Sequence, residues 1–215
     1  MNINEYYNNN YYNMGKVVYV CSYGGCGSTM LYSALQKIKE ITQASHVHSR
    51  TPPDNLEYIG HRNGHGKYCY REWFNGVKIP EDEIKDYYVL YIYRNPVKCI
   101  VSRFQIPEHL QHIQVDKNIK LDDVLNKSED LYGIHEFYNN YTQPNEKRNY
   151  KIISVKYEEI FDKQDELSEM LGIGPLNLVK KESNPVVYDE QTQTLNKIYK
   201  DLTNAMDKND FIMIN

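Results

Sequence analysis

A chain of 215 residues and 25.4 kDa is long enough to fold as one domain with its own hydrophobic core. Its 25 Lys and Arg nearly balance its 29 Asp and Glu, so the net charge of −4 predicts no general attraction to nucleic acid or to an anionic membrane. No apolar run reaches the roughly 18 residues that a membrane span needs, and none has the form of a signal peptide.

The first 14 residues predict a disordered or loosely attached arm. They are almost wholly Asn and Tyr, and they offer little aliphatic surface to bury. The remainder, 15–215, is predicted to form a single domain.

Beyond the arm, short apolar runs alternate with segments of helical spacing. The predicted strands are 17–21, 44–48, 88–93 and 152–155. The predicted helices are 28–39, 96–104, 163–171 and 191–207, and 107–141 is predicted to be helical but irregular. Strands separated by helices predict an α/β fold with a central parallel β-sheet flanked by helices, which binds ligands at the carboxyl ends of its strands.

A glycine loop joins the first strand to the first helix, with the sequence Ser22-Tyr23-Gly24-Gly25-Cys26-Gly27-Ser28-Thr29. Successive backbone N–H groups and the positive end of the helix dipole suit a phosphate group there. A Walker A motif would need Gly at position 22 and Lys at position 28, and both are Ser, which disfavours an ordinary ATPase or kinase. The dinucleotide fingerprint meets Met30 instead of its third Gly. A glycine turn without any ligand remains an alternative.

A second anion site is predicted after the 88–93 strand. Arg94 stands at the carboxyl end of that strand, and Ser102 follows on the helix that Asn95-Pro96 opens. A guanidinium group can hold two phosphate oxygens while a serine hydroxyl donates a third bond. Phosphate sites on neighbouring strands predict a nucleotide that carries phosphates at both ends.

These motifs resemble those of the sulfotransferases that use 3′-phosphoadenosine 5′-phosphosulfate (PAPS). The glycine loop resembles their 5′-phosphosulfate loop, and Arg94-Asn95-Pro96 with Ser102 resembles their 3′-phosphate motif. The run Val155-Lys156-Tyr157-Glu158-Glu159-Ile160 is similar to the family's strand and Tyr-Glu-Asp/Glu turn near the adenine. The resemblance covers roughly 17–50, 88–104 and 151–172, and it implies a P-loop NTPase-like sulfotransferase fold.

The resemblance implies transfer of a sulfuryl group from PAPS, as co-substrate, to a hydroxyl or amine of a small-molecule or glycan acceptor. Lys180 and Lys181 could reach the 3′-phosphate as the family's carboxyl-terminal basic segment does, and a solvated surface pair is the alternative. The implied nucleotide-binding residues are Gly24, Gly25, Cys26, Gly27, Ser28, Thr29, Arg94, Ser102, Tyr157, Lys180 and Lys181.

The segment after the second strand, 46–52, resembles the His-x-Pro-like segment that carries the catalytic histidine in many sulfotransferases. His48 is therefore the predicted base that takes the acceptor's proton, and an imidazole with a pKa near 6.5 suits this role. Alternation along the strand predicts that His46 and His48 lie on the same side. A structural histidine at position 48, with Glu57 or Glu72 as the base, is the alternative.

One position departs from the family. In its cytosolic members the loop carries a Lys that stabilises the leaving phosphate, and Gly25 occupies that position here. The predicted replacement is Arg50, with Arg62 and Lys67 as alternatives. Two other functions stay open: a non-catalytic PAPS- or nucleotide-binding protein of the same fold, and a divergent P-loop nucleotide kinase.

The four cysteines share no Cys-x-x-Cys spacing, which in a chain of this size predicts reduced thiols and a cytoplasmic protein. They are Cys21, Cys26, Cys69 and Cys99. The pairs His61 with His65 and His109 with His112 lack a third ligand at a metal-site spacing, so no metal is predicted.

Overall fold

The computed structural model describes residues 16–52, 58–59, 77–78, 87–104, 107–148, 150–180 and 189–215. Several predictions of the sequence analysis lie outside these residues. They are the arm at 1–14, Glu57 and Glu72 as alternative bases, Arg62 and Lys67 as alternative cations, Lys181, Cys69, and the pair His61 and His65.

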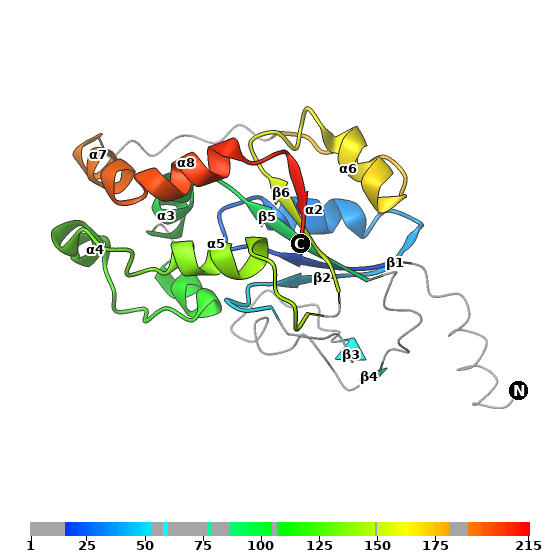
Figure 1. Cartoon of the computed structure of the whole chain (residues 1–215), viewed down its shortest axis with the longest axis horizontal. Coiled ribbons are helices and arrows are strands. Elements are labelled where there is room, and N and C mark those ends of the chain that lie inside the picture. The colour runs from blue at the N-terminus through cyan, green and yellow to red at the C-terminus, as the bar shows by residue number, and fades with distance from the viewer. Residues whose placement is uncertain are drawn as a thin grey trace, which may run out of the picture.

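The predicted α/β class is confirmed, since the molecule is built on a five-stranded sheet flanked by helices (Figure 1). The strands are β1 (Lys16–Cys21), β2 (Ile41–Val47), β5 (Tyr87–Tyr93), β6 (Ile152–Lys156) and β7 (Ile212–Ile214), in the order β2-β1-β5-β6-β7. The first four are parallel, whereas β7 pairs antiparallel with β6. The sequence did not predict this edge strand. A separate antiparallel pair joins β3 (Tyr58–Ile59) to β4 (Val77–Lys78).

The helices follow the predicted order with two differences. They are α2 (Ser28–Leu35), α3 (Pro96–Phe104), the 3₁₀ helix η2 (Pro107–Ile113), α4 (Leu121–Lys127), α5 (Ile134–Thr142), α6 (Gln164–Leu171), α7 (Asp189–Ile198) and α8 (Lys200–Lys208). Helix α2 ends earlier than predicted because Lys37 and Ile38 already bond to carbonyls three residues back. The predicted terminal helix is divided at Tyr199, whose hydroxyl donates to Asp130 at 2.9 Å. None of the helices in the described part of the chain has the length and apolar character that crossing a membrane requires.

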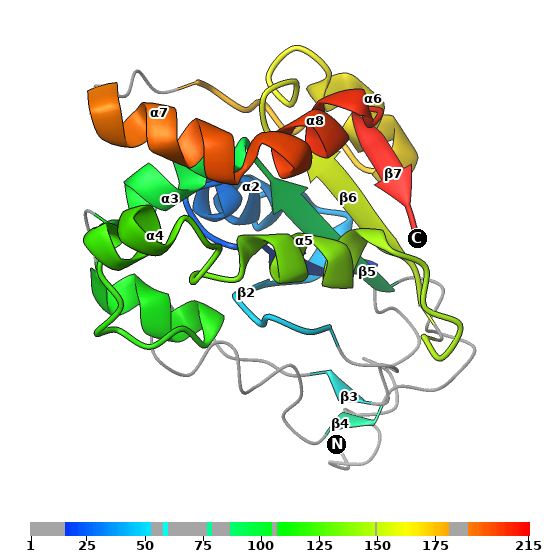
Figure 2. The ribbon, with the colours of Figure 1, turned by 60° about the vertical axis from the view of Figure 1, so that its left-hand side comes forward.

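Alternate residues of the strands face two helical layers, which Figure 2 shows in front of and behind the sheet. On one face, the Tyr91 ring stacks on the Tyr141 ring of α5 with centroids 4.6 Å apart, and Cys21 Sγ lies 3.0 Å from the same tyrosine's hydroxyl. On the other face, His46 stacks on Tyr32 of α2. The absence of alternation in β5 follows from this burial on both sides.

The strand register brings the carboxyl ends of three strands together. Cys21, the last residue of β1, pairs with Val47 of β2 and with Tyr91 of β5. Three segments therefore begin at the same carboxyl end of the sheet, where open α/β sheets bind ligands. They are the glycine loop, the segment from position 48, and the turn that contains Arg94. Asn95 caps α3 as predicted, because its side-chain oxygen accepts the Lys98 N–H at 3.2 Å.

Candidate functional site

The glycine loop is tightly curled, and close neighbours explain two of its glycines. Gly24 has φ 108° and Gly27 has φ 79°, a region that disfavours residues with a Cβ. A Cβ at Gly24 would overlap the guanidinium group of Arg103, and one at Gly27 would lie 2.6 Å from the Tyr157 ring. Gly27 directly precedes α2, so its left-handed conformation sets the direction in which the helix begins.

The loop, the start of α3 and the turn after β6 meet at this edge. Arg94 Nη1 donates to the carbonyl of Gly25 at 3.1 Å, and the Arg94 guanidinium lies 4.6 Å from the centroid of the Tyr157 ring. Ser102 Oγ lies 3.0 Å from the position that a Cβ of Gly25 would take. The three motifs that the sequence analysis assigned to one nucleotide are thus neighbours in space, although long segments separate them in the chain.

A cavity of about 370 Å³ opens over the loop. Its described lining residues are Gly24, Gly25, Gly27, Ser28, Thr29, His48, Ser102, Arg103, His109 and His112. Apart from the glycines, every one of these side chains carries a hydroxyl, an imidazole or a guanidinium group. Such a lining suits a small anionic or strongly polar ligand.

Arg103 is the cation that lines this cavity among the described residues. It stands in the last turn of α3, is only 4% exposed, and donates to the carbonyls of Tyr23 and, at 3.0 Å, His109. No sequence motif pointed to this residue. The guanidinium of Arg103 occupies the space that Gly24 leaves free. The spacing of apolar residues along a helix does not show which side chain fills such a space.

His48 lies at the cavity with a defined tautomer. Its Nδ1 is 2.6 Å from the carbonyl of Ser22, which can only accept, so Nδ1 carries the proton and Nε2 is the basic nitrogen. The His46 ring lies on the same side, as predicted, with ring centroids 4.6 Å apart. Burial lowers the pKa of His48 well below its ordinary value of 6.5, and neighbouring His46 and Arg103 lower it further. The imidazole is therefore neutral near pH 7.

The lowered pKa of His48 predicts a pH-dependent stability. The unfolded chain binds a proton at this residue near pH 6.5, whereas the folded chain does so only at lower pH. Between these pH values the unfolded state holds more protons, so the free energy of unfolding falls as the pH falls. Between pH 7.5 and pH 5.5, urea denaturation is expected to show a loss about 1 kcal/mol larger in the wild type than in His48→Asn, whose amide can still donate to Ser22. Equal losses in the two proteins would contradict the assignment.

Two further histidines line the cavity without having been assigned to it. His109 and His112 lie on η2, with their ring centroids 5.2 Å apart, and the His112 ring lies 6.1 Å from that of His48. The sequence singled out this pair only as a metal-ligand candidate without a third ligand, because the two residues belong to an irregular segment whose packing it did not predict. In the described ranges, no set of three His, Cys, Asp or Glu side chains is arranged to hold a metal ion.

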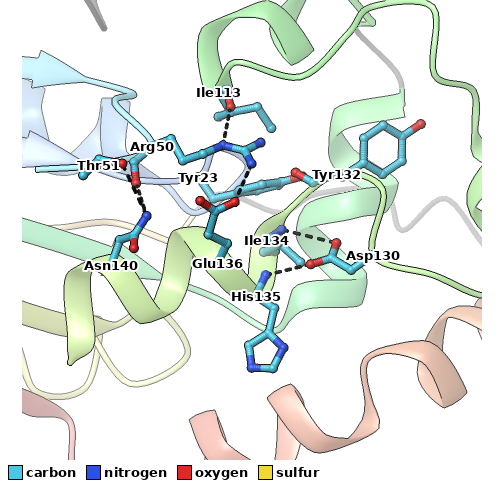
Figure 3. A network of polar contacts seen from close by, with 10 residues as sticks. All are labelled: Tyr23, Arg50, Thr51, Ile113, Asp130, Tyr132, Ile134, His135, Glu136 and Asn140. Carbon is cyan, nitrogen blue, oxygen red and sulfur yellow. Dashed lines mark hydrogen bonds and ion pairs between the residues drawn. The ribbon is translucent and has the colours of Figure 1, made fainter.

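Arg50 is directed to another part of the molecule (Figure 3). Its Nη1 pairs with Glu136 of α5 at 2.8 Å, and its Nε donates to the carbonyl of Ile113 at 3.2 Å. It is not among the described lining residues of the cavity. Arg50 thus ties the chain after β2 to α5 and η2, and the geometry does not support its predicted role as the cation of the loop.

A second cavity, of about 700 Å³, lies beside α2. It shares Gly27 and Thr29 with the first. Its other described lining residues, mostly apolar, are Met30, Ser33, Ala34, Lys37, Ile38, Tyr157, Phe161, Pro175, Leu176, Asn177, Leu178 and Val179. An apolar groove with a tyrosine ring at one edge suits a flat ring system such as a nucleobase.

The remaining predicted binding residues contribute less. The Cys26 side chain is buried against Cys99, with the sulfurs 3.3 Å apart, so only its backbone can serve the loop. Ser28 is also buried, and its hydroxyl lies 2.8 Å from both Ser22 Oγ and His46 Nε2. Lys180 is exposed and lines neither cavity.

Comparison with protein-family models and with curated proteins finds no match to this chain.

Proposed function

We propose that this protein binds PAPS and transfers its sulfuryl group to a hydroxyl or amine acceptor, as a P-loop-type sulfotransferase. The observation that carries the proposal is the convergence of Arg94, Ser102 and Tyr157 on the glycine loop. A nucleotide with phosphates at both ends needs two anion sites and a groove for its base within reach of one another. The polar cavity, Arg94 between β5 and α3, and the apolar groove supply such a set.

Each part of PAPS is assigned to a particular set of residues. The phosphosulfate lies over the loop, where the N-terminus of α2 and the hydroxyl of Thr29 meet its negative charge. The 3′-phosphate is held by Arg94, whose buried Nε makes no hydrogen bond within the described residues, and by Ser102. The adenine lies in the second cavity against Tyr157.

The chemistry follows from the tautomer of His48. The acceptor oxygen or nitrogen attacks the sulfur, and its proton goes to Nε2 of His48. The bond between sulfur and the bridging oxygen breaks, and the electron pair stays on that oxygen, which becomes part of the 5′-phosphate of the product. The hydrogen bond from Nδ1 to Ser22 holds the ring in the state that can accept a proton.

The proposal predicts a preference for adenosine 3′,5′-bisphosphate over AMP. The two differ by the 3′-phosphate, and a hydrogen bond to a charged group is worth about 1.5–3 kcal/mol, or roughly 10–150-fold in affinity. Calorimetry is expected to show this preference in the wild type and its loss in Arg94→Ala. Lys98→Ala, which removes an exposed cation four residues further along, in the first turn of α3, serves as the control and should keep the preference. Equal wild-type affinity for the two nucleotides would refute the assignment.

A non-catalytic nucleotide-binding protein is the second candidate, because residues 22–29 contain no Lys or Arg. Binding of the bisphosphate without release of sulfate from PAPS, and without modification of glycans, phenols or peptides, would favour it. A nucleotide kinase would instead require Mg²⁺ and a nucleoside triphosphate, so the same titration with ATP and Mg²⁺ separates that function.

A further inference from the structure

The glycine at position 25 is fixed by its surroundings. Its φ of 69° lies in the left-handed region, and a Cβ there would lie 3.0 Å from both Cβ and Oγ of Ser102. A lysine at this position would be strained and would displace Ser102. If the loop holds a leaving phosphate, its positive charge must therefore come from another element.

Arg103 meets the geometric requirements for that role. It lies one residue beyond Ser102, its guanidinium occupies the space beside Gly24, and it lines the same cavity as His48 and the loop. Its hydrogen bonds to the carbonyls of Tyr23 and His109 fix the guanidinium at the loop. A guanidinium held in this way needs no rearrangement when negative charge develops beside it.

We propose that Arg103 is the catalytic cation of this site and stabilises the leaving 5′-phosphate, in place of a lysine in the loop. This inference rests on the proposed function. As the bond between sulfur and the bridging oxygen breaks, its electron pair moves onto the phosphate oxygen and the sulfuryl group joins the acceptor. The charge on the 5′-phosphate therefore rises from substrate to product. A cation beside it binds the product nucleotide more strongly than the phosphosulfate, and the transition state lies between them.

This charge difference separates a catalytic role of Arg103 from a structural one. Adenosine 3′,5′-bisphosphate carries the 5′-phosphate that Arg103 would contact, whereas adenosine 3′-monophosphate lacks it. Arg103→Gln is expected to weaken binding of the bisphosphate by about 10–100-fold in calorimetry, and to change the affinity for the monophosphate by less than about threefold. Turnover of PAPS is expected to fall by about 10²–10³-fold at saturating substrate.

Three further variants complete the experiment. Arg103→Lys keeps the charge and is expected to recover part of the bisphosphate preference. Arg103→Met preserves the apolar stem beside the Tyr23 ring and replaces the glutamine variant if that one does not fold. Arg148→Gln removes a part-buried arginine that donates to Asn140 outside the cavity, and it should leave both affinities unchanged.

The outcomes are distinct. Equal weakening of both nucleotides, with a lowered melting temperature, would assign Arg103 a structural role and overturn the inference. Unchanged affinities and turnover would overturn it as well. If the wild type itself does not bind the bisphosphate, the proposed function fails, and the inference fails with it.

Discussion

Replacement of His48 with alanine is expected to lower the rate of sulfuryl transfer by about 10²–10⁴-fold, the usual contribution of a positioned general base. Nucleotide affinity should change by less than about threefold, because His48 contacts the acceptor side of the cavity in the proposed mechanism and not the nucleotide. The rate is measured on a responsive acceptor or, without one, as the slow release of sulfate from PAPS to water.

The matched control is His135→Ala, which removes an exposed histidine of α5 away from the cavity. Its turnover should equal that of the wild type. If His48→Ala transfers sulfate as fast as the wild type, the base is another residue, and Glu57 and Glu72 are the next to replace.

The pH profile gives this prediction a second readout. Because burial and the neighbouring His46 and Arg103 lower the pKa of His48 below 6.5, the imidazole is deprotonated and able to act as a base throughout the neutral range. The rate should therefore be flat near pH 7 and fall only on the acid side, below pH 6.5. A rate that already falls between pH 8 and pH 7 would point to a base with a higher pKa.

The parts of the fold that the sequence predicted are those whose local pattern agrees with the tertiary structure. Strand β5 is a run of bulky residues because both of its faces are buried, and Asn95-Pro96 opens α3 because one residue caps the helix and the next suits its first turn. Strand β7 has no such pattern. It covers only Ile212–Ile214, and its pairing with β6 depends on where the end of α8 places the following residues.

The residues of the candidate site also fall into those that a local sequence pattern singles out and those that it does not. The loop glycines lie between β1 and α2, and Arg94 and Ser102 belong to β5 and α3, so local spacing within each strand–loop–helix unit was enough to single them out. The ion pair of Arg50 with Glu136 could not be predicted, since Glu136 lies in a distant segment that no local pattern connects to Arg50. Arg103 was missed for a related reason: its position depends on a glycine in another unit of the chain.

The guanidinium of Arg103 packs against Gly24 of the loop. Replacement of Gly24 tests whether this packing contributes to stability. Alanine at this position would take up a left-handed conformation, at a cost of about 1–2 kcal/mol, and its Cβ would overlap the guanidinium of Arg103. Forcing an extra carbon into a filled space costs a further 1–3 kcal/mol or so. The free energy of unfolding of Gly24→Ala, measured with urea, is therefore expected to fall by about 2–5 kcal/mol.

Gly172→Ala separates the two contributions. Gly172 has φ 60° at the end of α6, but the nearest neighbours of an added Cβ are the terminal atoms of Lys16, at 3.5 and 3.7 Å. This variant should lose only the conformational part, about 1–2 kcal/mol, and should bind the bisphosphate as the wild type does. Gly24→Ala should also bind the bisphosphate more weakly, because the displaced guanidinium no longer lies beside the loop. If the two variants were equally stable, Arg103 would move aside at no cost. Its position beside the loop would then not be held by the fold, and the rigidity that the proposed catalytic role of Arg103 requires would be lost.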